Sequence, residues 1–202
     1  MRQEAESYEH AGVSVKIYYD EDPMSPREWD NLGTMVCWHR RYNLGDDQAP
    51  RDYDSVQDLI ESYDAKVLLP LYLYDHSGIT MNVGGFSDPW DSGQVGFIYV
   101  TAETIRKEYG CKRITAKVLA NVETCLRSEV GTYDQYLTGD VYEYVVDEDG
   151  RDEDRCCGLF GLEYAKEEAN DVADWVARQR RLPDRIYVDA VPIEEHFAGV
   201  AS

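Results

Sequence analysis

The stretch at residues 67–110, VLLPLYLYDHSGITMNVGGFSDPWDSGQVGFIYVTAETIRKEYG, limits the fold more than any other part of the chain. Its first eight residues are almost continuously apolar, which is typical of a strand buried on both faces. Pro70 interrupts this run and indicates an edge or bulged strand, because proline has no N–H for a central ladder. Residues 75–78 have turn chemistry, and residues 79–83 alternate apolar and polar side chains. The stretch therefore opens with two strands joined by a tight turn.

A third strand is predicted over residues 94–100, after the loop FSDPWDSG at residues 86–93. Thr101 follows as a helix N-cap, and Gly110 has the position of a glycine just beyond the helix end. We expect residues 95–100 to form an interior strand of a sheet, flanked by one of the two strands that precede it.

The rest of the chain predicts strands and helices in irregular order. Strands are expected at residues 13–19, 34–39, 133–137, 141–146, 155–160 and 185–191, and helical segments at 26–32, after the N-cap Ser55, at 113–128 and at 164–178. This order lacks strict strand–helix–strand alternation, which favours the α+β class. We predict one domain over residues 1–202, with a mixed or antiparallel sheet on which about three helices pack.

Two long segments resemble an uncharacterised family found in bacteriophages and mobile elements. They are SPREWDNLGTMVCWHRRYNLGD (residues 25–46) and YDHSGITMNVGGFSDPWDSGQVGFIYV (residues 74–100). The run CCGLFG (residues 156–161) is similar to a degraded form of a third segment of that family. The resemblance implies a small phage or plasmid accessory protein, and it brings no reaction and no catalytic residues.

Composition excludes several classes of protein. A hydrophobic content of 43% in 202 residues excludes a mainly disordered chain. No apolar run is long enough to span a membrane, and the N-terminal MRQEAESYEH lacks the pattern of a signal peptide. We therefore expect a cytosolic protein without a membrane partner. Its five cysteines, an odd number without framework spacing, are expected to be reduced.

The net charge of −20 is distributed unevenly. Residues 1–64 contain 15 acidic and 6 basic residues, and residues 132–202 contain 18 and 7. Residues 65–110 contain 5 and 3, and residues 111–131 contain 2 and 4. Such charge opposes direct binding of DNA or RNA, and it steers association towards basic surfaces. The distribution predicts a basic protein partner, most plausibly a nucleic-acid-binding host or defence protein.

Candidate metal sites have weak spacing. DEDGRDED (residues 147–154) resembles a calcium loop but lacks its later glutamate, so a hairpin turn is favoured. Two interpretations are open for Cys37, His39, His76, Cys156 and Cys157. They could together bind zinc, or the cysteines could be buried thiols and a histidine could lie at the end of a strand. No CxxC or HxxxH spacing supports the zinc site. We predict no metal and no cofactor.

Catalytic motifs are equally weak. Asp75-His76-Ser77 contains the letters of a catalytic triad, but neighbours in sequence do not reproduce its geometry. No phosphate-binding glycine loop of the GxxxxGK[ST] or GxGxxG type occurs. We therefore predict no catalytic residues, and a binding protein is favoured over an enzyme.

The acidic segments supply the candidate partner-binding residues. These are Asp46, Asp47, Asp52, Asp54, Asp88, Trp90, Asp91, Asp140, Asp147, Glu148, Asp149, Asp152, Glu153 and Asp154. Trp90 either lines a pocket or partner surface or fills the core, and the tyrosines at 133, 136 and 142 either pack in a sheet or form an interaction face.

Three functions are open at this point. The first is an acidic binding protein that mimics nucleic acid and inhibits a host defence system, restriction or CRISPR, by analogy with phage inhibitors. The second is a protein whose charge serves only solubility. The third is a small metal-dependent or hydrolytic enzyme. If residues 46–64 and 140–154 form one acidic face, the first gains, whereas a cleft with converging His and Asp favours the third.

Overall fold

The computed structural model describes residues 2–48, 56–148 and 151–180 of the chain. In chain order the elements are β1 (Glu4–His10), β2 (Val13–Tyr19), a 3-10 turn (Pro26–Glu28), β3 (Thr34–Cys37), β4 (Asp47–Gln48), α1 (Val56–Glu61), β5 (Ala65–Asp75), β6 (Ile79–Asn82), β7 (Ser92–Thr101), α2 (Ala102–Glu108), α3 (Ala116–Thr138), β8 (Val141–Glu148), β9 (Arg151–Phe160) and α4 (Leu162–Arg180). This mixture confirms the α+β class.

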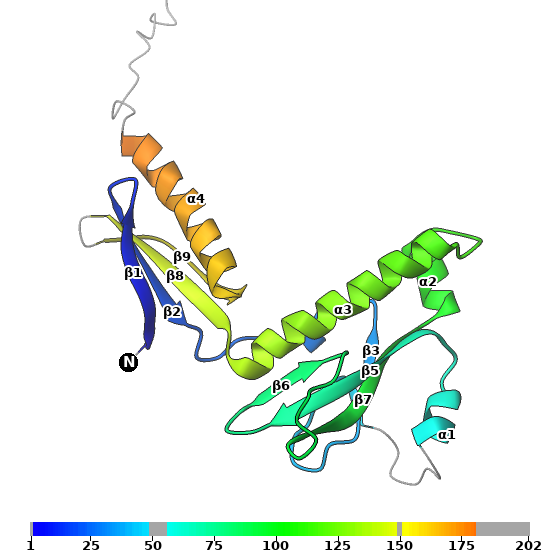
Figure 1. Cartoon of the computed structure of the whole chain (residues 1–202). Coiled ribbons are helices and arrows are strands. Elements are labelled where there is room, and N and C mark those ends of the chain that lie inside the picture. The colour runs from blue at the N-terminus through cyan, green and yellow to red at the C-terminus, as the bar shows by residue number, and fades with distance from the viewer. Residues whose placement is uncertain (1, 49–55, 149–150, 181–202) are drawn as a thin grey trace, which may run out of the picture.

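The strands form two sheets rather than one, and each sheet belongs to its own lobe (Figure 1). The smaller lobe has the order β1-β2-β8-β9 with α4 on one face. The larger lobe has the order β4-β3-β7-β5-β6 with α3 across one face. The sequence predicts a single sheet. The second sheet arises because strands from opposite ends of the chain, β2 and β8, pair with each other. The prediction of one domain stays a prediction.

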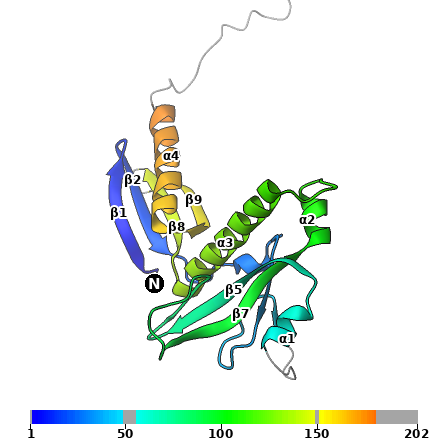
Figure 2. The same cartoon turned by 45° about the vertical axis from the view of Figure 1, so that its right-hand side comes forward.

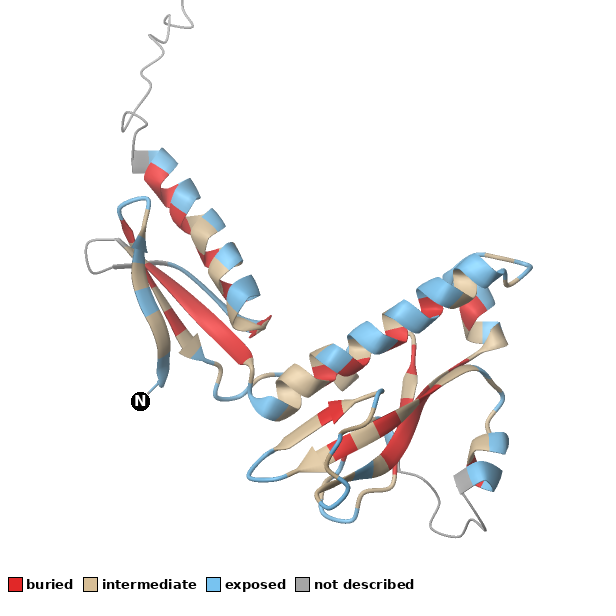
Figure 3. Cartoon of the chain, in the orientation of Figure 1, coloured by how far each residue is buried: buried red, intermediate tan, exposed pale blue. Residues whose placement is uncertain are grey.

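The smaller lobe depends on close packing of α4 against β2 and β8. The side chains of Ala165, Ala169 and Ala173 are fully buried against Val15 and Ile17. Because alanine has only a methyl group, the helix axis can approach the sheet closely. The opposite side of α4 is exposed along most of its length (Figure 3). The helix that the sequence predicts over residues 164–178 therefore packs on the sheet by its alanine side.

In the larger lobe β7 lies between β3 and β5, which confirms the predicted interior strand. Pro70 pairs with Phe97 of β7, whereas β6 pairs with β5 only from Tyr72 to Asp75. At Pro70, β5 therefore pairs with β7 on one side and has no paired strand among the described residues on the other. The core between this sheet and α3 contains Leu126 and Ile98, both fully buried.

The predicted strand at residues 133–137 is wrong, because α3 continues through it to Thr138. Val122, Leu126, Val130 and Tyr133 are buried at successive turns, so the apolar stripe of the helix does not stop at residue 128. Gly131 interrupts the sequence pattern but is tolerated at an exposed helix position.

Local signals located the other boundaries more accurately. The Thr101 hydroxyl accepts the Thr104 N–H at 3.1 Å, and Gly110 has a φ of +58°, as expected for the start and end of α2. The polar edge strand β1 was not predicted, because its pattern of EAESYEH is dominated by glutamates. The expected strand at 185–191 and the N-cap Ser55 lie outside the described residues.

The two lobes meet beside the C-terminal end of α3 (Figure 2). The Trp29 ring, from the larger lobe, packs edge-on against Phe160 of β9 with centroids 5.2 Å apart. Asp20, which follows β2, donates its N–H to the Val141 carbonyl at 2.9 Å and accepts the Gly158 N–H at 3.0 Å. These contacts tie the connection between the lobes to β8 and β9.

A buried ion network holds the loop before β3. The Arg27 side chain is only 6% exposed and bonds both oxygens of Asp46, at 2.9 and 2.6 Å. The same guanidinium contacts Glu129 of α3 at 3.1 Å and the Gly33 carbonyl at 2.7 Å. One cation thus bridges two carboxylates that lie far apart in sequence.

Candidate partner-binding site

The described residues of the predicted acidic segments lie in two different lobes. Asp46 and Asp47 belong to the larger lobe, whereas residues 140–148 and 151–154 belong to the smaller one. In Figure 1, α1 lies at the far edge of the larger lobe, whereas β8 and β9 lie in the smaller lobe on the other side of the molecule. The described acids of the two segments therefore lie on different surfaces.

Several predicted residues have structural roles. Asp46 accepts the Met35 N–H at 2.7 Å in addition to the Arg27 guanidinium. Asp140 accepts the Gln135 side-chain amide at 3.1 Å, and Asp147 lies 3.6 Å from the Lys16 ammonium. Asp47 lies in the short strand β4. These residues stabilise the junctions of the fold.

Some predicted positions cannot be placed. Asp52, Asp54 and Asp149 lie outside the described residues, and so do the side chains of Glu148, Asp152 and Glu153. β8 and β9 pair antiparallel as far as Glu148 and Arg151, so the described backbone of residues 147–154 lies in the two strands of the predicted hairpin.

The structure also settles where the uncertain aromatic residues lie. Trp90 is 91% exposed, so its indole does not fill the core. Tyr133 and Tyr136 stack on α3, with centroids 6.1 Å apart, and belong to the core of the larger lobe or pack against it. Tyr142 is buried beneath α4. These three tyrosines pack inside the lobes, whereas Trp90 is available to a ligand.

A hollow of about 360 Å³ lies between β9 and α4. Three carboxylates and one indole surround it, contributed by Asp154, Glu168, Asp171 and Trp175. Trp175 is 56% exposed, and Tyr164, on the same helix, is 50% exposed. We call the surface formed by Asp154, Tyr164, Glu168, Asp171 and Trp175 the acidic–aromatic face.

The spacing along α4 explains why these side chains share one face. Tyr164, Glu168, Asp171 and Trp175 stand at i, i+4, i+7 and i+11, which is one stripe of a helix. This stripe lies outside the alanine stripe that packs on the sheet. The helix was predicted from the sequence but its outward stripe was not, although the periodic acids and aromatics were a usable signal.

Burial and negative charge raise the pKa of several side chains at this face. The charge of Glu168 is the main cause of a raised pKa at Tyr164. Burial, followed by the charge of Asp154, raises the pKa of Tyr144 beneath the face to about 12. Burial also raises the pKa of the Cys156 thiol. The negative field that disfavours a tyrosinate anion would attract a cation to the face.

The face borders an edge strand. Among the described strands β9 pairs with β8 alone, and residues 154–158 are all exposed. The register shifts between Tyr142 and Tyr144, where Cys157 and Gly158 form a bulge with Gly158 at φ +72°. Bulges and charges of this kind oppose uncontrolled strand pairing. The edge is therefore suited to contact by side chains more than to extension of the sheet.

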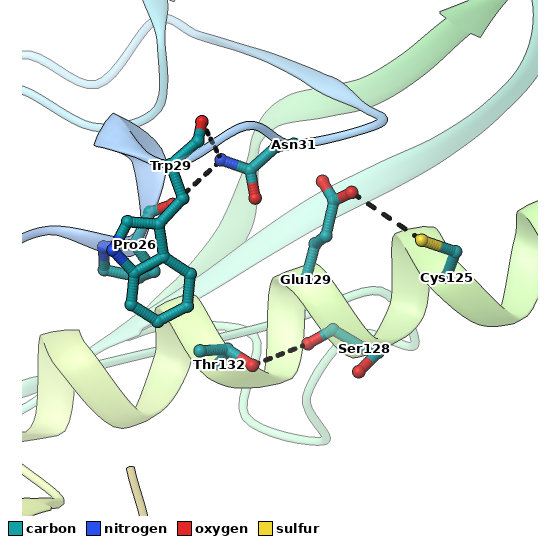
Figure 4. A pocket seen from close by; sticks show the side chains of 7 residues that line it. All are labelled: Pro26, Trp29, Asn31, Cys125, Ser128, Glu129 and Thr132. Atoms are coloured by element: carbon teal, nitrogen blue, oxygen red, sulfur yellow. Dashed lines mark hydrogen bonds between the residues drawn. The ribbon is translucent and has the colours of Figure 1, made fainter. Parts of the chain in front are cut away.

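The hollow in Figure 4 is part of the fold and not a second site. It has a volume of about 120 Å³ and lies where Trp29 meets α3. Its carboxylate, Glu129, already accepts the Leu32 N–H at 2.8 Å and the Arg27 guanidinium. Burial raises the pKa of the Cys125 thiol, so this sulfur is a poor nucleophile.

The candidate zinc ligands are not brought together. Cys37 is fully buried in the larger lobe, and Cys156 and Cys157 are exposed on the smaller one. All five cysteines are free thiols. Among the described residues, no group of three His, Cys, Asp or Glu side chains stands close enough to hold a metal ion.

Comparison with known proteins adds no relative. No family model matches the chain, and neither the curated proteins nor the solved structures contain a match. Across the described residues, none of the helices combines the length and apolar character needed to cross a membrane.

Proposed function

We propose that this protein is an acidic binding protein and that its acidic–aromatic face docks on a basic protein. The observation that carries the proposal is the hollow between β9 and α4, where three carboxylates surround the exposed Trp175. Lysine and arginine side chains are attracted both by carboxylates and by the face of an indole. The hollow thus provides for a cationic side chain and for the apolar stem that carries it.

The charge of the smaller lobe supports long-range attraction to such a partner. Residues 140–180 contain 13 acidic and 5 basic residues. An exposed ion pair alone contributes only about 0–1 kcal/mol, so the attraction depends on many carboxylates acting together. The larger lobe has a nearly neutral stretch, with 7 acidic and 7 basic residues over 65–131, which argues against charge placed for solubility alone.

Nucleic-acid-binding proteins are the natural class of basic partner. Their binding surfaces hold lysines and arginines spaced for phosphates. A compact acidic face of this kind occupies one such surface, as an inhibitor of a restriction or CRISPR protein would. Because the two acidic segments lie in different lobes, the acidic–aromatic face would imitate only a short length of nucleic acid.

An affinity experiment tests the proposal. The purified chain serves as bait in a bacterial lysate at low and at high salt, and captured proteins are identified by mass spectrometry. A second bait bears Asp154→Lys, Glu168→Lys and Asp171→Lys. A third bears Glu61→Lys, Asp64→Lys and Glu103→Lys, which reverse exposed acids of the larger lobe. We expect the first and third baits to capture the same basic proteins at low salt, and the second to lose them.

Binding is then measured with the purified partner. Its affinity is expected to fall as salt rises, because the Debye length decreases from about 10 Å at 0.1 M to about 3 Å at 1 M. Partners held equally well by all three baits, without dependence on salt, would contradict the proposal.

A further inference from the structure

A second hollow, of about 410 Å³, lies at the end of the larger sheet where β5 ends and β7 begins. Leu73, Val95 and Gly93 supply its apolar part, and polar side chains surround them. The polar residues are His39, Arg41, Asp75, Asp91 and Ser92, with Trp90 at the rim. We call this the Trp90 hollow. Its residues come from three separate segments of the chain, which only the folded sheet brings together.

One side of the hollow presents hydrogen-bond donors in a fixed arrangement. His39 Nδ1 accepts the backbone N–H groups of Arg41 and Tyr42, at 3.3 and 3.2 Å. In the neutral ring the proton is therefore on Nε2, which is left as a donor. The His39 ring also stacks on the Tyr42 ring, with centroids 5.0 Å apart.

Arg41 adds a cation on the same side. Its Nη1 contacts Asp75 Oδ2 at 3.1 Å, and its guanidinium carbon lies 5.2 Å from the centre of the Tyr42 ring. The Tyr42 hydroxyl donates to the other Asp75 oxygen at 3.2 Å. The Arg41 side chain is 70% exposed, so the guanidinium is positioned while part of its donor fork remains open to solvent.

The other side presents an indole and an acceptor. Asp88 accepts the N–H groups of Trp90 and Asp91, at 2.8 and 3.3 Å, and this turn holds the Trp90 side chain away from the core. Asp91 Oδ2 lies 2.8 Å from His76 Nδ1. Asp91 Oδ1 has no hydrogen-bond partner among the described residues, and it is an acceptor available at the hollow.

These groups together match one class of ligand. A planar heteroaromatic ring would stack on Trp90 and place its N–H groups towards Asp91. A phosphate attached to it would meet the guanidinium of Arg41, which suits phosphate geometry. Base stacking on an aromatic side chain is sequence-tolerant and contributes to affinity even at an exposed site. A long nucleic acid would instead be repelled by the net charge of −20.

We propose that the Trp90 hollow binds a mononucleotide, with the base against Trp90 and the phosphate at Arg41. This site lies on the larger lobe and does not depend on the acidic–aromatic face.

Calorimetric titration with AMP, GMP, CMP and UMP tests the proposal, with inorganic phosphate and the matching nucleosides as separate probes. We expect saturable binding of at least one nucleotide, and weaker binding of its nucleoside and of phosphate alone. Trp90→Ala should weaken the nucleotide about tenfold or more. Trp175→Ala, which removes an exposed indole of the smaller lobe, should change the affinity less than about twofold.

Two further variants assign the ends of the ligand. Arg41→Gln should weaken the nucleotide and leave the nucleoside unchanged, because only the nucleotide has a phosphate. Asp91→Asn should change the preference among the bases. Unchanged thermal unfolding of Trp90→Ala would show that the loss is one of binding, as its exposure predicts. The proposal is overturned by the absence of nucleotide binding at millimolar concentration, by equal losses in Trp90→Ala and Trp175→Ala, or by a basic peptide that binds at Trp90 when nucleotides do not.

Discussion

The two lobes differ in how their acidic side chains are paired and in the size of the side chains that pack their helices. In the larger lobe, acids at the core are neutralised: Asp46 and Glu129 share the buried Arg27, and large side chains fill the space beneath α3. In the smaller lobe, alanines bring α4 onto the sheet, and the outward carboxylates of the helix collect around Trp175. The comparison shows that the net charge alone is a poor guide to function. Carboxylates that are already paired stabilise the fold, and those left at a surface are available to a partner.

The largest effect on stability is expected from removal of Arg27. Arg27→Ala leaves the partly buried carboxylates of Asp46 and Glu129 without their cation, and the expected cost is at most the about 3–5 kcal/mol typical of a broken buried pair. Urea unfolding followed by circular dichroism measures the loss. The variant Arg27→Met with Asp46→Asn and Glu129→Gln removes all three charges and should recover part of the stability. A loss below about 1 kcal/mol for Arg27→Ala would show that the network is not important for the larger lobe.

An oversized side chain under α4 should destabilise the smaller lobe by less. Ala169→Leu inserts a larger side chain where alanine is fully buried, at a typical cost of about 1–3 kcal/mol. Hydrogen exchange should then increase in β2 and β8 before it increases in β7. Ala120→Leu, at an exposed position of α3, is the control and should stay within about 0.5 kcal/mol of the wild type. Equal effects of the two substitutions would contradict the close packing of α4.

Two glycines of α3 and its end, where the lobes meet, should show smaller effects on stability that differ in sign. Gly139 has a left-handed φ of +74°, and a Cβ there would contact nothing within 4 Å. Gly139→Ala should therefore cost about 1–2 kcal/mol through backbone strain alone. Gly131→Ala, inside the helix and equally free of contacts, should instead stabilise by about 0.5–1 kcal/mol. Thermal unfolding of the two variants should show shifts of opposite sign.

Alkaline pH should weaken the larger lobe. Burial raises the pKa of the Cys37 thiol to about 12, above its ordinary value of 9.0. Since the folded state holds this proton more tightly than the unfolded chain, the contribution is complete below pH 9 and is lost as the pH rises towards 12. For Tyr144 of the smaller lobe, the loss of stability begins near its ordinary pKa of 10.0. Urea unfolding of Cys37→Ala should therefore depend less on pH above 9 than the wild type does.

Local patterns predicted what depends on neighbours in sequence. The strands around Pro70 and Val95, and the caps Thr101 and Gly110, follow from alternation, turn residues and capping chemistry. The division into two sheets was not predicted, because pairing of β2 with β8 joins residues from opposite ends of the chain. The role of Asp46 was misjudged for a related reason, since its partner Arg27 is an unremarkable residue in the sequence. Both hollows combine segments that only tertiary structure brings together.

We propose that binding depends on the acidic–aromatic face and not on charge in general. The direct measurement is the affinity of a short lysine- and arginine-rich peptide for three proteins at low salt, by calorimetry. These are the wild type, the Asp154→Lys, Glu168→Lys, Asp171→Lys variant, and the Glu61→Lys, Asp64→Lys, Glu103→Lys variant, so the two variants have equal net charge. We expect that only reversal on the smaller lobe abolishes binding. Equal weakening by both sets would contradict it and would assign the attraction to net charge alone.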